Sequence, residues 1–218
     1  MERITEAFVW PFRDPEWPQK VSIMGVILLI PIVGSINGLG WMLAALDRLR
    51  AGEERLPPSN LGYLGRGFGL FAVSLVYYLV FLLIAAAVYL PAVLILDAEG
   101  RSSPNAALVA AGASLSLLAF SILSLGSLVV TFATPPIVLE FTRGGIWGAL
   151  RVSAVAAAMR KSPANTVIAG LMLVAVQFIA GLGLFVCVIG VLFTSALALA
   201  MVAWIIRSFE VGSPAPAG

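Results

Sequence analysis

The sequence predicts an all-α fold, a polytopic α-helical bundle in a membrane, and three observations carry this prediction. First, the 41 residues from Thr166 to Ile206 include no charged side chain. About 20 apolar residues cross a hydrocarbon core as a helix, so this run is long enough to cross twice. Second, residues 67–96 and 105–139 form two further uncharged runs of spanning length. Third, 61% of the 218 residues are hydrophobic and 11% are charged, whereas soluble domains are about 25% charged. Because helices satisfy their own backbone groups in lipid, four full helical spans are expected.

The first 20 residues are predicted to form an interfacial N-terminal segment, because apolar and charged side chains are mixed there. Asp14, Pro15 and Glu16 read as a helix start, with Asp14 as the N-cap residue. Trp10 and Trp17 are expected at the headgroup level, where an amphipathic ring is stable.

The run from Val21 to Leu46 is uncharged but is interrupted in its middle by Pro31, Gly34, Gly38 and Gly40. It either spans once with a kink, as a fifth span, or turns back as a re-entrant pair of half-helices. Residues 21–30 and 35–46 are each too short to cross alone, which favours the re-entrant form. Such a turn must be buried by protein, since lipid cannot satisfy its backbone.

Polar residues and prolines delimit the next two runs. Ser59 or Asn60 is expected to cap the helix that enters the run over 67–96, and residues 97–103 form a polar outer loop. Pro135 and Pro136 should stop or kink the following helix. A glycine-rich approach to the second run lacks the strand and the Lys-Ser/Thr of a phosphate loop, so it indicates close helix packing. Its members are Gly62, Gly65, Gly67 and Gly69.

The last third of the chain predicts an interfacial helix over residues 145–161 and then a membrane hairpin. Gly181 and Gly183 mark the reversal of this hairpin, and Arg207 closes its second crossing. The predicted organisation is therefore an interfacial segment over 1–20, a single membrane domain over 21–207 and a disordered tail over 208–218.

The basic residues predict the orientation in the membrane. Nine of them fall on one side of the predicted spans: Arg48, Arg50, Arg55, Arg66, Arg143, Arg151, Arg160, Lys161 and Arg207. The positive-inside rule makes this side cytoplasmic, together with the C-terminus. A re-entrant first segment adds Arg3, Arg13 and Lys20, giving twelve against Arg101 alone, whereas a spanning segment gives nine against four. We therefore expect a multi-pass protein of the cell membrane with both termini in the cytoplasm.

The composition excludes several classes of chemistry. The chain has no His and one Cys, Cys187, which removes His-based acid–base catalysis, most zinc sites and an internal disulfide. The net charge of +2 is too small to indicate nucleic-acid binding. No catalytic, cofactor-binding or metal-binding residue is predicted. The expected partner is the lipid bilayer, with other membrane subunits or a second copy of the chain as protein partners.

One set of residues is a candidate site, a polar stripe on the third membrane run. At about 100° per residue its hydroxyl groups share one side of a helix, and the amide from the next span can reach across. The stripe either lines a polar path for a small solute or makes hydrogen bonds between helices, and the second interpretation is favoured. Its members are Ser121, Ser124, Ser127, Thr131, Thr134 and Gln177.

Several short motifs together resemble one known family. They are Trp-Pro-Phe-Arg-Asp-Pro-Glu-Trp over residues 10–17, Gly40-Trp41, Leu56-Pro57 and Ser162-Pro163-Ala164-Asn165. The pattern resembles the prokaryotic membrane proteins catalogued as domain-of-unknown-function family 4013, over roughly residues 7–207. Family members often have Tyr where this chain has Trp41. The resemblance implies an uncharacterised multi-span membrane protein of bacteria or archaea, and it carries over no catalytic residues.

Two hypotheses about function follow. The favoured one is a non-catalytic scaffold, an accessory subunit or a transport or channel-like component, because the apolar runs contain no convergent ionisable groups. The alternative is a membrane enzyme that acts on lipid headgroups at the cytoplasmic interface. Its candidate acid–base residues are Asp47, Glu53, Glu54 and Glu140.

Overall fold

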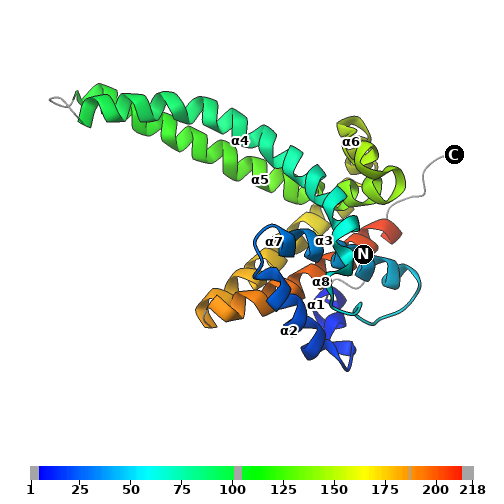
Figure 1. Ribbon diagram of the computed structural model, residues 1–218. Helices are drawn as coiled ribbons and strands as arrows, with labels where there is room; N and C mark the ends of the chain where they lie inside the picture. Colours follow the sequence, from blue (N-terminus) through cyan, green and yellow to red (C-terminus); the bar gives the residue numbers. More distant parts are fainter. Residues whose placement is uncertain (1–4, 101–104, 187, 213–218) are drawn as a thin grey trace. The chain divides into compact units, whose positions relative to one another are not determined.

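The computed structural model describes residues 5–100, 105–186 and 188–212, and every element within them is a helix. This confirms the predicted all-α fold. The elements, shown in Figure 1, are α1 (Glu6–Val9), η1 (Trp10–Arg13), α2 (Trp17–Leu28), α3 (Val33–Arg50), η2 (Leu61–Tyr63), α4 (Leu64–Gly100), α5 (Ala106–Ala149), α6 (Val152–Lys161), α7 (Pro163–Leu182), η3 (Gly183–Val186) and α8 (Val188–Gly212).

The chain divides into two compact units. The first unit contains Met1–Val73 and Thr131–Gly218, and the second contains Ser74–Val130. Helices α4 and α5 contribute residues to both. Among the described residues, four stretches are long and apolar enough to cross a membrane, which agrees with the four predicted spans. They are Leu61–Gly100, Ala106–Ala149, Pro163–Phe185 and Gly190–Gly212.

The second unit is an antiparallel hairpin of α4 and α5, which run side by side in Figure 1. A Cβ on Gly112 would meet the Leu96 side chain, and a Cβ on Gly126 would meet the Phe81 ring. Between these levels, Tyr89 and Phe120 are in edge contact at 5.9 Å. Small residues therefore bring the two helices close, and most other side chains of the hairpin are exposed.

The first unit is built around α8, against which α2, α3 and α7 pack. Helices α7 and α8 form the second hairpin, and the chain reverses after Leu182, as Gly181 and Gly183 predicted. The Thr194 hydroxyl donates a hydrogen bond to the Ala180 carbonyl at 2.8 Å, which fastens α8 to the end of α7. Cys187 lies outside the described residues.

The broken hydrophobic segment forms a helical hairpin within the first unit. Helix α2 has 12 residues and α3 has 18, and neither is among the stretches that are both long and apolar enough to span. A Cβ on Gly34 would meet the Ile27 carbonyl, and the Asn37 amide contacts the Met24 sulfur at 3.9 Å. As α3 moves forward from Gly34 to Asn37, its contacts on α2 move backward from Ile27 to Met24, so the two helices are antiparallel. The reversal required by the re-entrant form is therefore present.

The turn between α2 and α3 satisfies much of its own backbone. The N–H of Ile30 donates to the Ile27 carbonyl at 3.1 Å, and the N–H of Gly34 donates to the Ile30 carbonyl at 2.8 Å. Pro31 has no N–H that needs a partner. Ile32 has φ +64°, an unfavourable value for a β-branched residue, and begins the reversal. The turn was expected to be buried by protein, but Leu29, Ile30 and Ile32 are exposed. Its local hydrogen bonds, and not a protein cover, satisfy much of its backbone.

Helix α3 crosses the start of α4 at a pair of glycines. A Cβ on Gly67 would overlap the Ile36 carbonyl, and a Cβ on Gly40 would overlap the Tyr63 carbonyl. The predicted close packing of the glycine-rich approach is therefore confirmed at Gly67. It does not extend to Gly65, where an added Cβ would meet open space.

Helix α5 continues through Pro135 and Pro136, where the sequence predicted a stop or a kink. Its helical geometry is interrupted instead at Gly145, which has φ +62°. Both prolines are buried in the first unit, and proline is tolerated in membrane helices where neighbouring groups satisfy the freed backbone. Asn60 caps η2 by accepting a hydrogen bond from the Gly62 N–H at 2.8 Å, one of the two caps expected there.

The ends of the chain differ in detail from the sequence prediction. Trp10, expected at the headgroup level, is completely buried in the first unit. Helix α8 continues to Gly212, so the start of the predicted tail is helical, while residues 213–218 lie outside the described range. Asp97 and Glu99 belong to the last turn of α4 and not to a loop, and residues 101–104 also lie outside that range.

Candidate functional site

A buried carboxylate, Asp14, organises the N-terminal part of the first unit. Its side chain is 1% exposed. Oδ1 accepts a hydrogen bond from the Glu16 N–H at 2.9 Å. Oδ2 accepts one from Lys20 Nζ and one from the Leu56 N–H, both at 2.8 Å. The carboxylate thus joins the start of α2 to the loop that follows α3.

The surroundings keep Asp14 ionised. Burial alone would raise its pKa, but the hydrogen bonds from Lys20 and from the two backbone N–H groups outweigh burial, and the pKa is lowered. With a low pKa and both oxygens occupied, this carboxylate is a poor general base. The chemistry of the group is that of a structural anchor.

The loop held by Asp14 is fastened at further points. Lys20 Nζ and Arg48 each donate to the Leu56 carbonyl at 3.1 Å. The Trp41 indole N–H donates to the Pro57 carbonyl at 3.2 Å. The residues that carry the family resemblance around positions 41 and 56–57 are therefore in direct contact, and their role is to hold this loop.

Trp10 fastens the N-terminal segment to α8. Its indole N–H donates to the Ala200 carbonyl at 3.2 Å. Its ring stacks on the ring of Trp204, with 5.9 Å between the two ring centroids. A buried Trp requires a partner for its N–H, and the carbonyl supplies one. The segment predicted to lie on the membrane surface is thus partly an internal element of the first unit.

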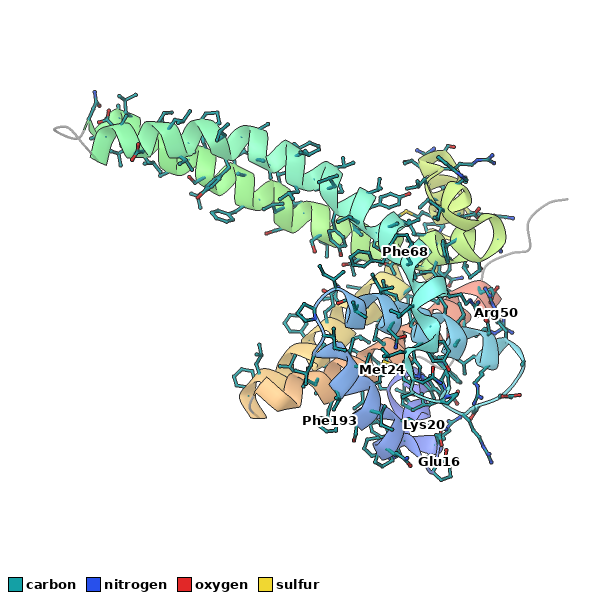
Figure 2. All side chains as sticks on the ribbon, viewed as in Figure 1. Glu16, Lys20, Met24, Arg50, Phe68 and Phe193 are labelled. Atoms are coloured by element: carbon teal, nitrogen blue, oxygen red, sulfur yellow. The ribbon has the colours of Figure 1, made fainter. Side chains whose placement is uncertain are left out.

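A second polar cluster, the Arg50 cluster, joins the ends of three helices. Arg50 holds Glu210 with two hydrogen bonds, at 3.0 and 2.9 Å, and donates to the Thr142 hydroxyl at 3.2 Å. Arg207 adds a third contact to Glu210 at 2.9 Å. Figure 2 labels Arg50 at the end of α3, beside the end of α8. Paired contacts from one guanidinium fix both the distance and the orientation of the two helix ends.

The four carboxylates of the enzyme hypothesis do not converge. Each is next to a different basic residue: Asp47 pairs with Arg50 and Arg66, Glu53 with Arg48, Glu54 with Arg13 and Glu140 with Arg143. The last pair has the spacing of three residues expected from the sequence. Within the described residues, no group of three or more His, Cys, Asp or Glu side chains could hold a metal ion.

The predicted polar stripe is divided between the two units. Ser121, Ser124 and Ser127 are exposed on α5 in the second unit, and the Ser121 hydroxyl donates to the Leu117 carbonyl of its own helix at 2.8 Å. Such back-bonding satisfies a hydroxyl within one helix.

The other members of the stripe lie in the first unit. Thr131 is buried and Thr134 is half-buried on α5. The exposed Gln177 of α7 donates its side-chain N–H to the Thr131 hydroxyl at 3.2 Å. This contact is the bond between helices that the sequence analysis favoured for these two residues. The assignment of the whole stripe as packing or as a path stays a prediction.

Sequence reasoning missed the two most connected acids, Asp14 and Glu210. Asp14 was assigned only a capping role, and nothing local indicated that Leu56 would meet it. Glu210 follows Arg207 by three residues, a spacing that could have suggested that pair. Its stronger partner, Arg50, is 160 residues away in sequence, and no local pattern indicates such a contact.

Comparison with protein families gives one match. The family model described as protein of unknown function (DUF4013) matches residues 23–189, which is most of the chain. The match begins after the motif over residues 10–17, so it covers less than the resemblance predicted from the sequence. No curated protein and no solved structure matches the chain.

Proposed function

We propose that this chain, which belongs to the DUF4013 family, is a non-catalytic scaffold or accessory subunit of a cell membrane. The observation that carries the proposal is that the four candidate carboxylates are all in ion pairs. Every carboxylate considered for acid–base chemistry has a basic partner, from 2.5 Å for Glu54 and Arg13 to 4.0 Å for Glu53 and Arg48. A carboxylate oxygen that is held by a cation must leave this contact before it can accept a proton from a substrate.

The second unit supplies a surface for assembly. Both helices of its hairpin carry large exposed apolar side chains, among them Leu83 on α4 and Leu125 on α5, which are 61% and 63% exposed. Apolar surface of this kind is expected to contact lipid or other membrane helices. A subunit role uses part of this surface for a protein partner.

The first experiment separates the subunit role from the enzyme alternative. Asp47→Ala with Glu140→Ala, expressed from the gene in a deletion strain, should rescue every phenotype of the deletion. Loss of rescue with normal membrane levels of the protein would favour acid–base chemistry. Glu99→Ala, at the other end of α4 from the clusters, is the matched control.

The second experiment looks for the partner itself. A photo-crosslinking amino acid at Leu83 or Leu125 should give one discrete adduct after irradiation of cells. The same amino acid at Leu173, which is 4% exposed in the first unit, should give none. Purification of the full chain in mild detergent should retain the same partner, and a clean monomer with no adduct would contradict the proposal.

A further inference from the structure

The segment between α5 and α7 has an unusual charge pattern. Residues 141–162 contain Arg143, Arg151, Arg160 and Lys161 and no Asp or Glu. Elsewhere in the first unit, basic residues are interspersed with acids, as in the Glu53-Glu54-Arg55 turn. A run of cations without acids gives this part of the surface a positive potential.

Helix α6 presents that charge outward. Val155 is 4% exposed and packs inward, whereas Ser153, Ala157 and Arg160 are exposed. The end of α6 is held in place because the Thr166 hydroxyl donates to the Met159 carbonyl at 3.3 Å. Figure 1 shows α6 as a short separate helix between the end of α5 and the start of α7.

Most guanidinium groups of the first unit are already in ion pairs. Arg13, Arg48, Arg50, Arg66, Arg143 and Arg207 each have a carboxylate within 4.0 Å. Among the described residues, Arg55, which directly follows Glu53 and Glu54, has no such partner, and neither do Arg151 and Arg160 of the acid-free segment. Their charge is available to an external anion.

Exposed apolar side chains lie beside these cations. Trp147 is 80% exposed and Val152 is 64% exposed. Tryptophan is enriched at membrane interfaces, where its ring sits at the headgroup level. Because α7 begins at Pro163, two residues after Lys161, the end of α6 lies where a spanning stretch starts. The exposed apolar and basic groups are therefore at the depth of the headgroups.

We propose that the segment from Arg143 to Lys161 binds the anionic headgroups of phospholipids in the leaflet where α7 begins. Arg151 and Arg160 supply the charge, with Lys161 beside Arg160, and the side chains of Trp147 and Val152 enter the boundary between headgroups and acyl chains. A soluble protein partner is disfavoured by the position of α6 beside the start of α7. This inference does not depend on the proposed scaffold role.

The test measures which lipid the full chain retains. The protein is purified in mild detergent and incubated with equal amounts of phosphatidylglycerol and phosphatidylcholine, and the bound lipids are counted by native mass spectrometry. The native chain should prefer phosphatidylglycerol, and Arg160→Gln should weaken this preference by about fivefold. Replacing Arg151, Arg160 and Lys161 together by Gln should abolish it. Arg55→Gln, an exposed arginine with acids beside it, should change it by less than about twofold.

A charge-conserving variant separates charge from folding. Arg160→Lys with Lys161→Arg should keep the preference, while the triple Gln variant should lose it at an unchanged melting temperature. A preference that survives in the folded triple variant would overturn the proposal. So would displacement of phosphatidylglycerol by millimolar inorganic phosphate, since that result would identify a site for a small soluble anion. If the triple variant fails to fold, the single Arg160→Gln variant decides the question.

Discussion

At the scale of single residues, the most demanding feature is the buried ion pair of Asp14 and Lys20. Removing two charges from water costs several kcal/mol each, and attraction offsets this only when further hydrogen bonds complete the pair. Here the Glu16 and Leu56 N–H groups complete the carboxylate, and the Leu56 carbonyl accepts from Lys20. The pair therefore depends on the loop being in place, and the loop depends on the pair.

Asp14→Asn should destabilise the chain by about 3 kcal/mol, because one carboxylate oxygen becomes an NH₂ group that cannot accept hydrogen bonds, and Lys20 keeps only the exposed Glu16 as a counter-charge. Unfolding in detergent, followed by denaturant or heat, measures the change. Glu16→Gln is the matched control. Glu16 also contacts Lys20, at 3.1 Å, but its side chain is 69% exposed, so the cost should stay under about 1 kcal/mol. Equal costs at the two positions would contradict the anchor role of Asp14.

Asp14 also predicts that the stability of the folded chain depends on pH. The pKa of Asp14 is lower in the folded chain than its ordinary value of 3.8. The group therefore contributes stability that is full above 3.8 and is lost as the pH falls through the lower folded value. Stability of the native chain should drop in this range, and Asp14→Asn should lack that part of the drop. Parallel curves for the two chains below about pH 5 would show that other carboxylates dominate.

Gln177 tests whether the polar stripe is structural. Gln177→Leu removes the hydrogen bond to Thr131 but keeps the bulk of the side chain, and it should cost less than about 1.5 kcal/mol. Melting temperature in detergent is the measurement. A much larger loss would mean that Gln177 anchors a wider polar network, and a polar path along the stripe would then gain support.

At the scale of elements, the crossing of α3 and α4 depends on the absence of two side chains. Gly67→Ala should destabilise the chain by about 1–3 kcal/mol, because the new Cβ would force the backbone of Ile36 to move. Gly65→Ala, two residues earlier on the same helix, meets open space and should be neutral or stabilising by up to about 1 kcal/mol. Similar effects at both positions, measured by unfolding in detergent, would rule out the close crossing.

The elements also show what the sequence could predict. Uncharged length identified the four spans, because about 20 apolar residues have few other stable environments. Pro31 and its neighbouring glycines located the break between α2 and α3. Pro135 and Pro136 did not stop α5, because local propensity does not include the tertiary contacts that let the helix continue. Gly145, with its positive φ, was the true interruption.

At the scale of the whole molecule, the polar contacts of the site were beyond prediction. Arg50 meets Glu210, and Trp10 meets Ala200, across 160 and 190 residues of sequence. The sequence predicts that charged residues gather at the ends of the membrane spans. It does not predict which helix ends are in contact. The contacts of residues 13–20 with the loop around Leu56 could not be predicted either, because α2 and α3 separate the two segments in the sequence. The contacts of residues 13–20 with the loop after α3 nevertheless carry a prediction about the side of the membrane on which the N-terminus lies.

The orientation follows from which residues share an end of the α2–α3 hairpin. Arg13 pairs with Glu54, and Lys20 binds the Leu56 carbonyl, so the residues before α2 lie beside the loop after α3. Figure 2 labels Lys20 and Met24 on α2, and Glu16 just before the start of this helix. Both ends of the hairpin are therefore together, and a segment that spans the membrane would separate them.

We therefore expect the N-terminus on the same side as the nine clustered basic residues, which the positive-inside rule makes cytoplasmic. The test replaces Cys187 with Ser, places a single Cys at Thr5 or at Ser103, and labels intact cells with a membrane-impermeant maleimide. Ser103→Cys should be labelled, because it follows one span, and Thr5→Cys should be labelled only after the cells are opened. Labelling of both positions in intact cells would mean that residues 21–46 cross the membrane. The contacts of Arg13 and Lys20 with the loop after α3 could not then exist in the membrane, because the lipid core would lie between them.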